Sequence, residues 1–258
     1  MQDIAPELYE KIKNTFSEKV EKDSYISEFL RMVQKNSATF PDAQKYAKRL
    51  GELLGEALLE ELKENVLPDG KLYWNIADRT IRPMLNQNYD LVNKAAAEVQ
   101  KILDKKDGIG LNAVKAARPD ERIKGLLDNA TVDGLEFSEV QRRMTTPVQN
   151  ITESFFDDFV YENAAFRYEA GMNPQIVRVL VGKNPCKWCK SLAGVYDYDD
   201  VRDTGNPVFQ RHTDCHCQIY FKNNKGRYLQ GVHSKRIVRD PTAINARALL
   251  NLDVIKKG

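Results

Sequence analysis

Apolar residues recur every three or four positions through the first hundred residues of this chain, which is the spacing of one face of an α-helix. Leu8, Ile12 and Phe16 follow one another at intervals of four, and we expect a first helix that begins near Asp3. A second helix is predicted across residues 26–33. A third has a wider apolar stripe, made by Leu50, Leu53, Leu54, Ala57, Leu58 and Leu62.

The longest predicted helix runs from Lys71 to Lys106, with a kink expected at Pro83. Beyond the proline, apolar residues alternate in steps of four and three, which is a seven-residue repeat. They are Leu85, Tyr89, Val92, Ala96, Val99 and Leu103. Because only a few such repeats are present, we expect a hairpin with the preceding helix rather than an oligomeric coiled coil.

Glycine and proline interrupt the apolar pattern over residues 107–147, which predicts an irregular connector with short helices. The helical pattern resumes at Val148 and carries an aromatic stripe that we assign to the core. Gly171 is expected to end this helix, and a strand is expected at Ile176. The stripe consists of Ile151, Phe155, Phe159 and Phe166.

Further strands are predicted at residues 218–221 and, after a turn at 223–226, through Tyr228 and Leu229. Asp240 and Pro241 are typical of the start of a last helix. The expected fold is therefore α+β and mainly α.

Four regions follow from these patterns. We expect an elongated helical bundle or hairpin over residues 1–106, the connector over 107–147, a small zinc-stabilised α+β domain over 148–232 and a basic tail with a short helix over 233–258. No apolar stretch approaches the roughly 18 residues needed to span a bilayer, so no membrane partner is expected.

All four cysteines and two of the three histidines lie within residues 185–221. Cys186 and Cys189 form a C-x-x-C pair, which places two thiolates on one tight turn. Cys215 and Cys217 form a C-x-C pair, whose side chains share one face of an extended segment. Two such pairs can fill the tetrahedral shell of a zinc ion.

The metal ligands that we predict are Cys186, Cys189, Cys215 and Cys217, with His212 as the first substitute for Cys215 or Cys217. His212 qualifies because it precedes Cys215 by only three residues. His216 lies between two strand cysteines and is expected to face away. Four protein ligands leave no open position for water, so the expected zinc is structural and no catalytic activity is expected.

Redox, disulfide and catalytic roles for these cysteines fit the sequence less well than a metal site. An apolar strand that leads into C-x-x-C is typical of thioredoxin-like redox sites, but Gly194 would cut short the helix that should follow. Disulfides remain possible, although nothing marks the chain as secreted. A zinc deaminase is excluded, since its H-x-E motif must precede P-C-x-x-C and no histidine occurs before residue 212.

The arrangement resembles the C-terminal signature of the Mu F-like minor head proteins of tailed bacteriophages, also called phage head morphogenesis proteins. Three motifs in order carry the resemblance: the helical lead-in over residues 163–171, then C-x-x-C-x-x-L-x-G from Cys186 to Gly194, then H-x-x-C-x-C from His212. It covers about residues 150 to 225. The chain departs from the family pattern at Thr213, which replaces a proline, and at His216, which replaces an arginine.

The resemblance implies a structural protein inside the phage head, bound to the portal protein and present in several copies. Its partners would include the major capsid protein and the packaged DNA, and its location would be the virion, after assembly in the host cytoplasm. Head assembly, DNA packaging or DNA ejection would be its role.

The charge distribution bears on the DNA contact. Residues 218–258 carry nine Lys or Arg against two acidic residues, a net charge of +7, whereas the whole chain has a net charge of +2. A basic segment favours non-specific contact with nucleic acid, although many such segments are simply solvated.

Two other classes of function stay open. One is a small zinc-supported nuclease, in which His212, His216 or His233 would activate water near an acidic loop. The other is a zinc-stabilised adaptor unrelated to phage. The loop, which we expect to be a solvated turn, contains Asp197, Asp199, Asp200 and Asp203.

Overall fold

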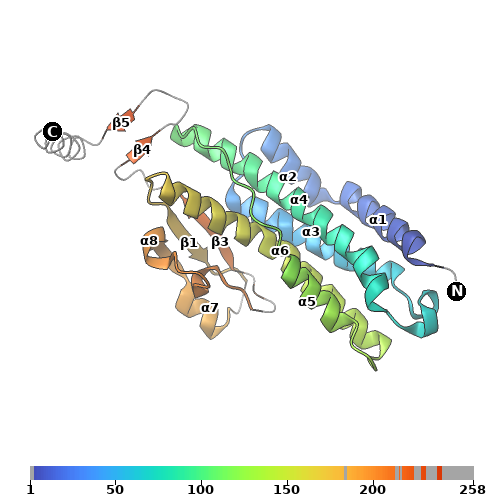
Figure 1. The fold of residues 1–258 in the computed structure, drawn as a ribbon. Helices are drawn as coiled ribbons and strands as arrows, with labels where there is room; N and C mark the ends of the chain where they lie inside the picture. Colours follow the sequence, from blue (N-terminus) through green and yellow to red (C-terminus); the bar gives the residue numbers. More distant parts are fainter. Residues whose placement is uncertain are drawn as a thin grey trace, which may run out of the picture.

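Long helices form most of the structure, and a small antiparallel sheet packs against them towards the C-terminal end (Figure 1). The computed structural model describes residues 3–182, 185–212, 215, 217–223, 228–230 and 237–239. The expectation of a mainly α member of the α+β class is confirmed. The predicted last helix at Asp240 lies outside the described residues.

The first three helices begin where polar side chains can bond their free amide groups. Asp23 accepts a hydrogen bond from the Ile26 amide at 2.9 Å and so caps the second helix. Thr39 and Asp42 form a capping box at the start of the third. The three helices are α1 (Ala5–Lys22), α2 (Ser24–Gln34) and α3 (Phe40–Glu61).

Two short 3₁₀ turns, Glu64–Val66 and Pro68–Gly70, lead into α4 (Trp74–Asp107). One continuous α4 passes through Pro83, and Gly108 ends it in the left-handed conformation with a φ of 72°. The helix packs against α3, which confirms the predicted intramolecular pairing.

Helix α5 (Asp120–Ala130) is the short helix of the predicted connector, but α6 (Phe137–Glu169) differs from expectation. The predicted helix start at Val148 is wrong, because α6 already begins at Phe137 and runs through Pro147. The boundary that we expected between residues 147 and 148 thus falls inside a helix.

Close packing against α3 accounts for the continuity of α6. A β-carbon added to Gly51 would lie 2.9 Å from the Cα of Gln149, and one added to Gly55 would lie 3.2 Å from the Cγ2 of Thr145. These contacts fall on both sides of Pro147. The contact between the two backbones therefore stabilises the helical conformation where the proline would otherwise favour a break.

The main sheet has the order β2-β1-β3, with both pairs antiparallel. Its strands are β1 (Gln175–Val179), β2 (Gly194–Asp197) and β3 (Gln218–Lys222), and Ile176 lies opposite both Tyr196 and Phe221. The sequence did not predict β2. Short helices α7 (Lys187–Leu192) and α8 (Tyr198–Val201) and a 3₁₀ turn (Pro207–Phe209) fill the connections.

The strand predicted through Tyr228 and Leu229 exists as β4 (Tyr228–Gln230). Within the described part of the chain it pairs with β5 (Ile237–Arg239) and not with β3. Most of the predicted turn at 223–226 lies outside the described residues.

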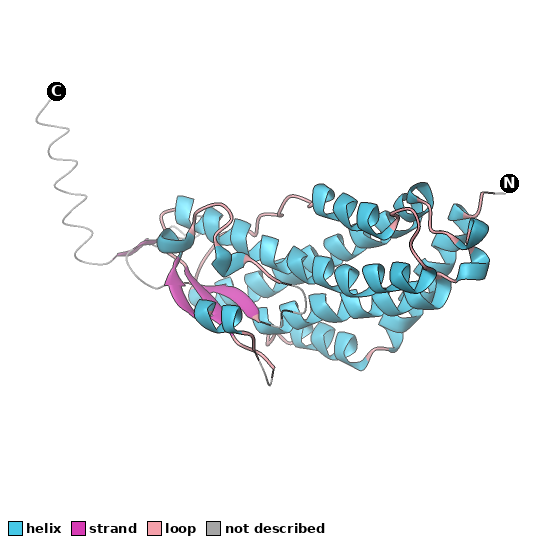
Figure 2. Ribbon diagram, turned by 90° about the horizontal axis from the view of Figure 1, so that it is seen from below, coloured by secondary structure: helices cyan, strands magenta, loops and turns pink. Residues whose placement is uncertain are grey.

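Sheet and helices share one apolar core. The centre of the Phe40 ring in α3 lies 4.8 Å from the ring centre of Phe221 in β3 and 6.1 Å from the ring centre of Phe156 in α6. Figure 2 shows the strands at one end of the helical layer, away from the N-terminus. The described helices include no apolar stretch of the kind that spans a bilayer.

Candidate metal centre

The C-x-x-C turn lies at the start of α7, just after β1. Cys186 is the N-cap of this helix, and its Sγ accepts a hydrogen bond from the Cys189 amide at 3.3 Å. This local bond fixes both sulfur atoms on one side of the turn. Cys186 is exposed, whereas Cys189 is buried.

His212 reaches both sulfur atoms from the segment ahead of β3. Its Nε2 lies 3.2 Å from the Sγ of Cys186 and 3.1 Å from the Sγ of Cys189. The two halves of the sequence signature are therefore in direct contact.

The C-x-C pair completes the cluster from the other side. The Sγ of Cys215 lies 3.7 Å from the Sγ of Cys189, and the ligand atoms of Cys189, Cys215 and Cys217 are all within 4.8 Å of one another. All three thiols are at least 97% buried. All five predicted ligands thus come together in two overlapping groups that share Cys189.

These separations fit a metal site better than disulfides. With metal–sulfur bonds of about 2.3 Å, two sulfur atoms of a tetrahedral shell are about 3.8 Å apart. A disulfide would bring them to about 2.05 Å. The 3.7 Å between Cys189 and Cys215 matches an edge of a tetrahedron, and all four cysteines are free.

The thiols differ in acidity. A hydrogen bond from the Cys189 amide, together with His212, lowers the pKa of Cys186. Burial raises the pKa of Cys189 to about 12 and also raises the pKa of Cys217. Buried thiols such as these lose their protons only when a positive charge is close by, as a bound metal would be.

The geometry does not favour a thioredoxin-like redox site or a metal site in the acidic loop. Helix α7 is only six residues long, so the C-x-x-C turn is not followed by the long helix of a thioredoxin-like site. Asp199 of the acidic loop accepts a hydrogen bond from the Tyr168 hydroxyl at 2.6 Å, and Asp197 accepts one from Gln175. Within the described ranges the loop aspartates join no group suited to a metal.

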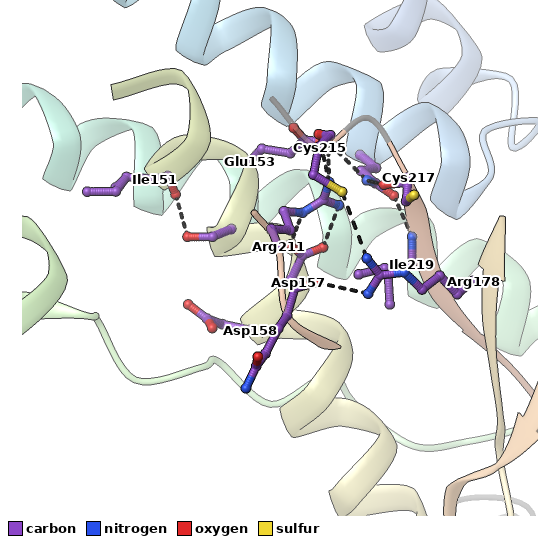
Figure 3. Close-up of polar contacts among 12 residues, drawn as sticks. Ile151, Glu153, Asp157, Asp158, Arg178, Arg211, Cys215, Cys217 and Ile219 are labelled. Atoms are coloured by element: carbon purple, nitrogen blue, oxygen red, sulfur yellow. Dashed lines mark hydrogen bonds and ion pairs between the residues drawn. The ribbon is translucent and has the colours of Figure 1, made fainter. Parts of the chain in front are cut away.

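A buried ion-pair network supports the segment that carries His212. Arg211 lies 3.1 Å from Glu153 and 2.9 Å from an oxygen of Asp157, both on α6 (Figure 3). It also donates to the Cys215 carbonyl at 3.4 Å. Burial raises the pKa of Glu153, whereas the neighbouring guanidinium opposes that shift.

Gln44 of α3 also holds this segment. Its Nε2 donates to the Cys217 carbonyl at 2.9 Å, and its Oε1 accepts from the Ile219 amide at 3.0 Å. The side chain bonds this edge of β3 as a neighbouring strand would.

Arg178 of β1 approaches the sulfur atoms directly. Its NH2 group donates to the Sγ of Cys215 at 3.8 Å, a contact that Figure 3 shows. Sequence reasoning missed Arg178, Arg211 and Gln44. One available signal was the spacing of Glu153 and Asp157, which places two acids one helical turn apart within a strongly aromatic stretch.

His216 and His233, the other candidate histidines, lie outside the described residues. No protein-family model, curated protein or solved structure matches this chain.

Proposed function

We propose that this chain is a structural minor head protein of a tailed phage, in which a zinc ion joins the α7 turn to the segment ahead of β3. The contact of His212 with Cys186 and Cys189 carries the proposal. It brings together the two motifs on which the resemblance to the Mu F-like family rests, although Cys189 and His212 are 23 positions apart in the sequence.

Zinc fits the donor set best among common divalent ions. Thiolate and imidazole ligands favour zinc, whereas magnesium and calcium prefer oxygen donors. A structural zinc site is closed by four protein ligands, and here five candidate side chains form two groups that share Cys189. The ion would fix the geometry of two segments and would leave no place for a reacting water.

The nuclease alternative has less support. A hydrolytic centre needs an available general base, but Glu153 and Asp157, the buried acids that contact the segment carrying His212, are both bonded to Arg211. Metal-dependent nicking of plasmid DNA that is lost in a His212→Ala variant would favour the nuclease over our proposal.

We assign docking to the long helices. The bundle extends well beyond the sheet and offers a long surface to the portal protein and the major capsid protein (Figure 1). The basic residues of the 218–258 segment would meet the packaged DNA through non-specific contacts with phosphates.

The location of the protein in purified particles tests this function. We expect quantitative mass spectrometry of full phage heads to find the chain in several copies, at a constant ratio to the portal protein. Particles that lack the chain would contradict the proposal. The adaptor alternative is separated by the neighbouring genes, since portal, scaffold and capsid genes beside this one are expected only for a phage head protein.

A further inference from the structure

Arg178 is a buried cation without a carboxylate partner among the described residues. Only 1% of the residue is exposed, and its Nε has no acceptor. By contrast, the similarly buried Arg167 is ion-paired with Asp104 and Arg211 with Glu153 and Asp157. An isolated buried charge is costly, so an anion should lie beside Arg178.

Backbone carbonyl oxygens accept hydrogen bonds from one nitrogen of the Arg178 guanidinium. Its NH1 donates to the carbonyl oxygens of Pro207, Val208 and Gln210, at 3.2, 2.7 and 2.8 Å. These dipoles solvate the charge but carry no net charge themselves. The same bonds fix the course of the segment that leads to His212.

A sulfur atom and an aromatic ring also lie beside the guanidinium. Arg178 NH2 donates to the Sγ of Cys215 at 3.8 Å, and the guanidinium lies 5.0 Å from the ring centre of Trp188, the third residue of the C-x-x-C motif. The Trp188 ring in turn lies 5.6 Å from the His212 ring. Arg178 therefore touches each segment that supplies ligands.

We propose that Arg178 is the counter-charge of an anionic metal–thiolate centre and positions Cys215 as a ligand. The inference rests on the proposed metal site. A divalent ion with three thiolates and one neutral imidazole carries one negative charge, which Arg178 balances. Four thiolates would give the centre two negative charges, and Arg178 would balance only one of them. Arg211 would not balance the other, since it is already paired with two acids. Charge balance, together with the contacts of Cys215 with Cys189 and Arg178, thus favours Cys186, Cys189, His212 and Cys215 as the ligand set.

Two substitutions separate charge from shape. Arg178→Gln keeps amide donors for the carbonyl oxygens but removes the charge, whereas Arg178→Lys keeps the charge. Competition of the purified full chain with a zinc chelator should show about 10- to 100-fold weaker zinc binding for Arg178→Gln, the usual effect of losing a supporting residue. Arg178→Lys should bind zinc more tightly than Arg178→Gln. The control is Arg202→Gln, because Arg202 is an exposed arginine of the same region and its side chain is 54% exposed.

Unfolding with and without zinc excludes a merely structural role. We expect zinc to raise the midpoint of thermal unfolding less in Arg178→Gln than in the wild type. Equal zinc affinity for the Gln, Lys and wild-type proteins would overturn the proposal. If Arg178→Gln does not fold, Arg178→Lys decides alone: bound zinc at full stoichiometry supports the counter-charge, and its loss contradicts it. Because purified protein is used, this result is independent of whether the chain occurs in phage heads.

The ligand set has its own comparison. Cys217→Ser should retain zinc, while Cys215→Ser should lose it. Both thiols are buried, at 2% and 3% exposure, so the two substitutions are closely matched in environment. Retention in Cys215→Ser with loss in Cys217→Ser would overturn the assignment of Cys215.

Discussion

Gln44 donates a hydrogen bond from its side-chain amide to the carbonyl oxygen of Cys217, which lies 2.9 Å away and 173 residues further along the chain. The same side chain accepts a bond from the Ile219 amide at 3.0 Å. A residue of α3 thus bonds Cys217, which lies just before β3, and Ile219, which lies within β3. Bundle and candidate metal centre are one connected structure.

Replacing Gln44 by Ala should destabilise the protein by about 1–3 kcal/mol, because a buried carbonyl and a buried amide would lose their partner. Urea unfolding of the zinc-loaded protein measures this change. Gln34→Ala is the control, since Gln34 is exposed near the end of α2 and should show little effect. Equal stabilities for the two variants would contradict this role of Gln44.

Two glycine substitutions should act in opposite directions. Gly51→Ala should cost about 1–3 kcal/mol, because its β-carbon would lie 2.9 Å from the Cα of Gln149 and would push α3 away from α6. A β-carbon added to Gly125 in α5 would meet no atom within 4 Å, so Gly125→Ala should stabilise the protein by about 0.5–1 kcal/mol through helix propensity. Denaturant midpoints of both variants provide the test, and stabilisation by Gly51→Ala would disprove the close approach.

The sequence predicted those elements whose pattern is local. Leu8, Ile12 and Phe16 are buried as their four-residue spacing required, and the cysteine motifs predicted which side chains meet. The helix start predicted after Pro147 was wrong because the long-range contact of α6 with α3 outweighs the local preference of proline for a break. No local pattern in the sequence reveals that contact. Strand β2 was missed for a similar reason, since its residues are only partly buried and pair with β1 across the C-x-x-C turn.

The residues that support the site were beyond sequence reasoning. Gln44 and Cys217 are 173 positions apart, and Arg211 and Asp157 are 54 apart. A single glutamine or arginine in a sequence carries no mark of burial, because most such residues are exposed. Only the packing of α3 and α6 around the sheet gives these side chains their partners.

The ion pair of Asp104 and Arg167 joins α4 to α6 in the interior, where the exposed fractions of the two side chains are 2% and 0%. Asp104→Ala should cost about 3–5 kcal/mol, because it leaves a buried guanidinium without its anion. Asp90→Ala, which removes an exposed partner of Lys115, is the control and should change the unfolding free energy little. A cost for Asp104→Ala no larger than for the control would show that the buried pair contributes nothing.

Asp158 should make stability depend on pH. Burial raises the pKa of this carboxyl to about 6 from its ordinary value of 3.8; Arg122 opposes the shift, and Asp157 and Glu162 reinforce it. The folded state therefore holds this proton more tightly than the unfolded state. The contribution is complete below pH 3.8 and is lost as the pH rises through about 6.

Asp158→Asn removes the titration. The difference in unfolding free energy, variant minus wild type, should therefore become more positive from pH 4 to pH 7. The first pH lies near the ordinary pKa of 3.8, and the second lies above the raised pKa of about 6. Urea titrations at a series of pH values measure this difference. A relative stability that stays constant, or decreases, over the range would rule out the raised pKa.

The metal content of the purified chain decides whether the cluster of cysteines and His212 holds an ion. Elemental analysis of protein prepared under reducing conditions without chelator should find one zinc ion per chain. Cys189→Ser should lose it, because both groups of candidate ligands contain Cys189. Wild-type protein with much less than one ion per chain, or a Cys189→Ser variant that retains the ion in full, would rule out a zinc site in this cluster.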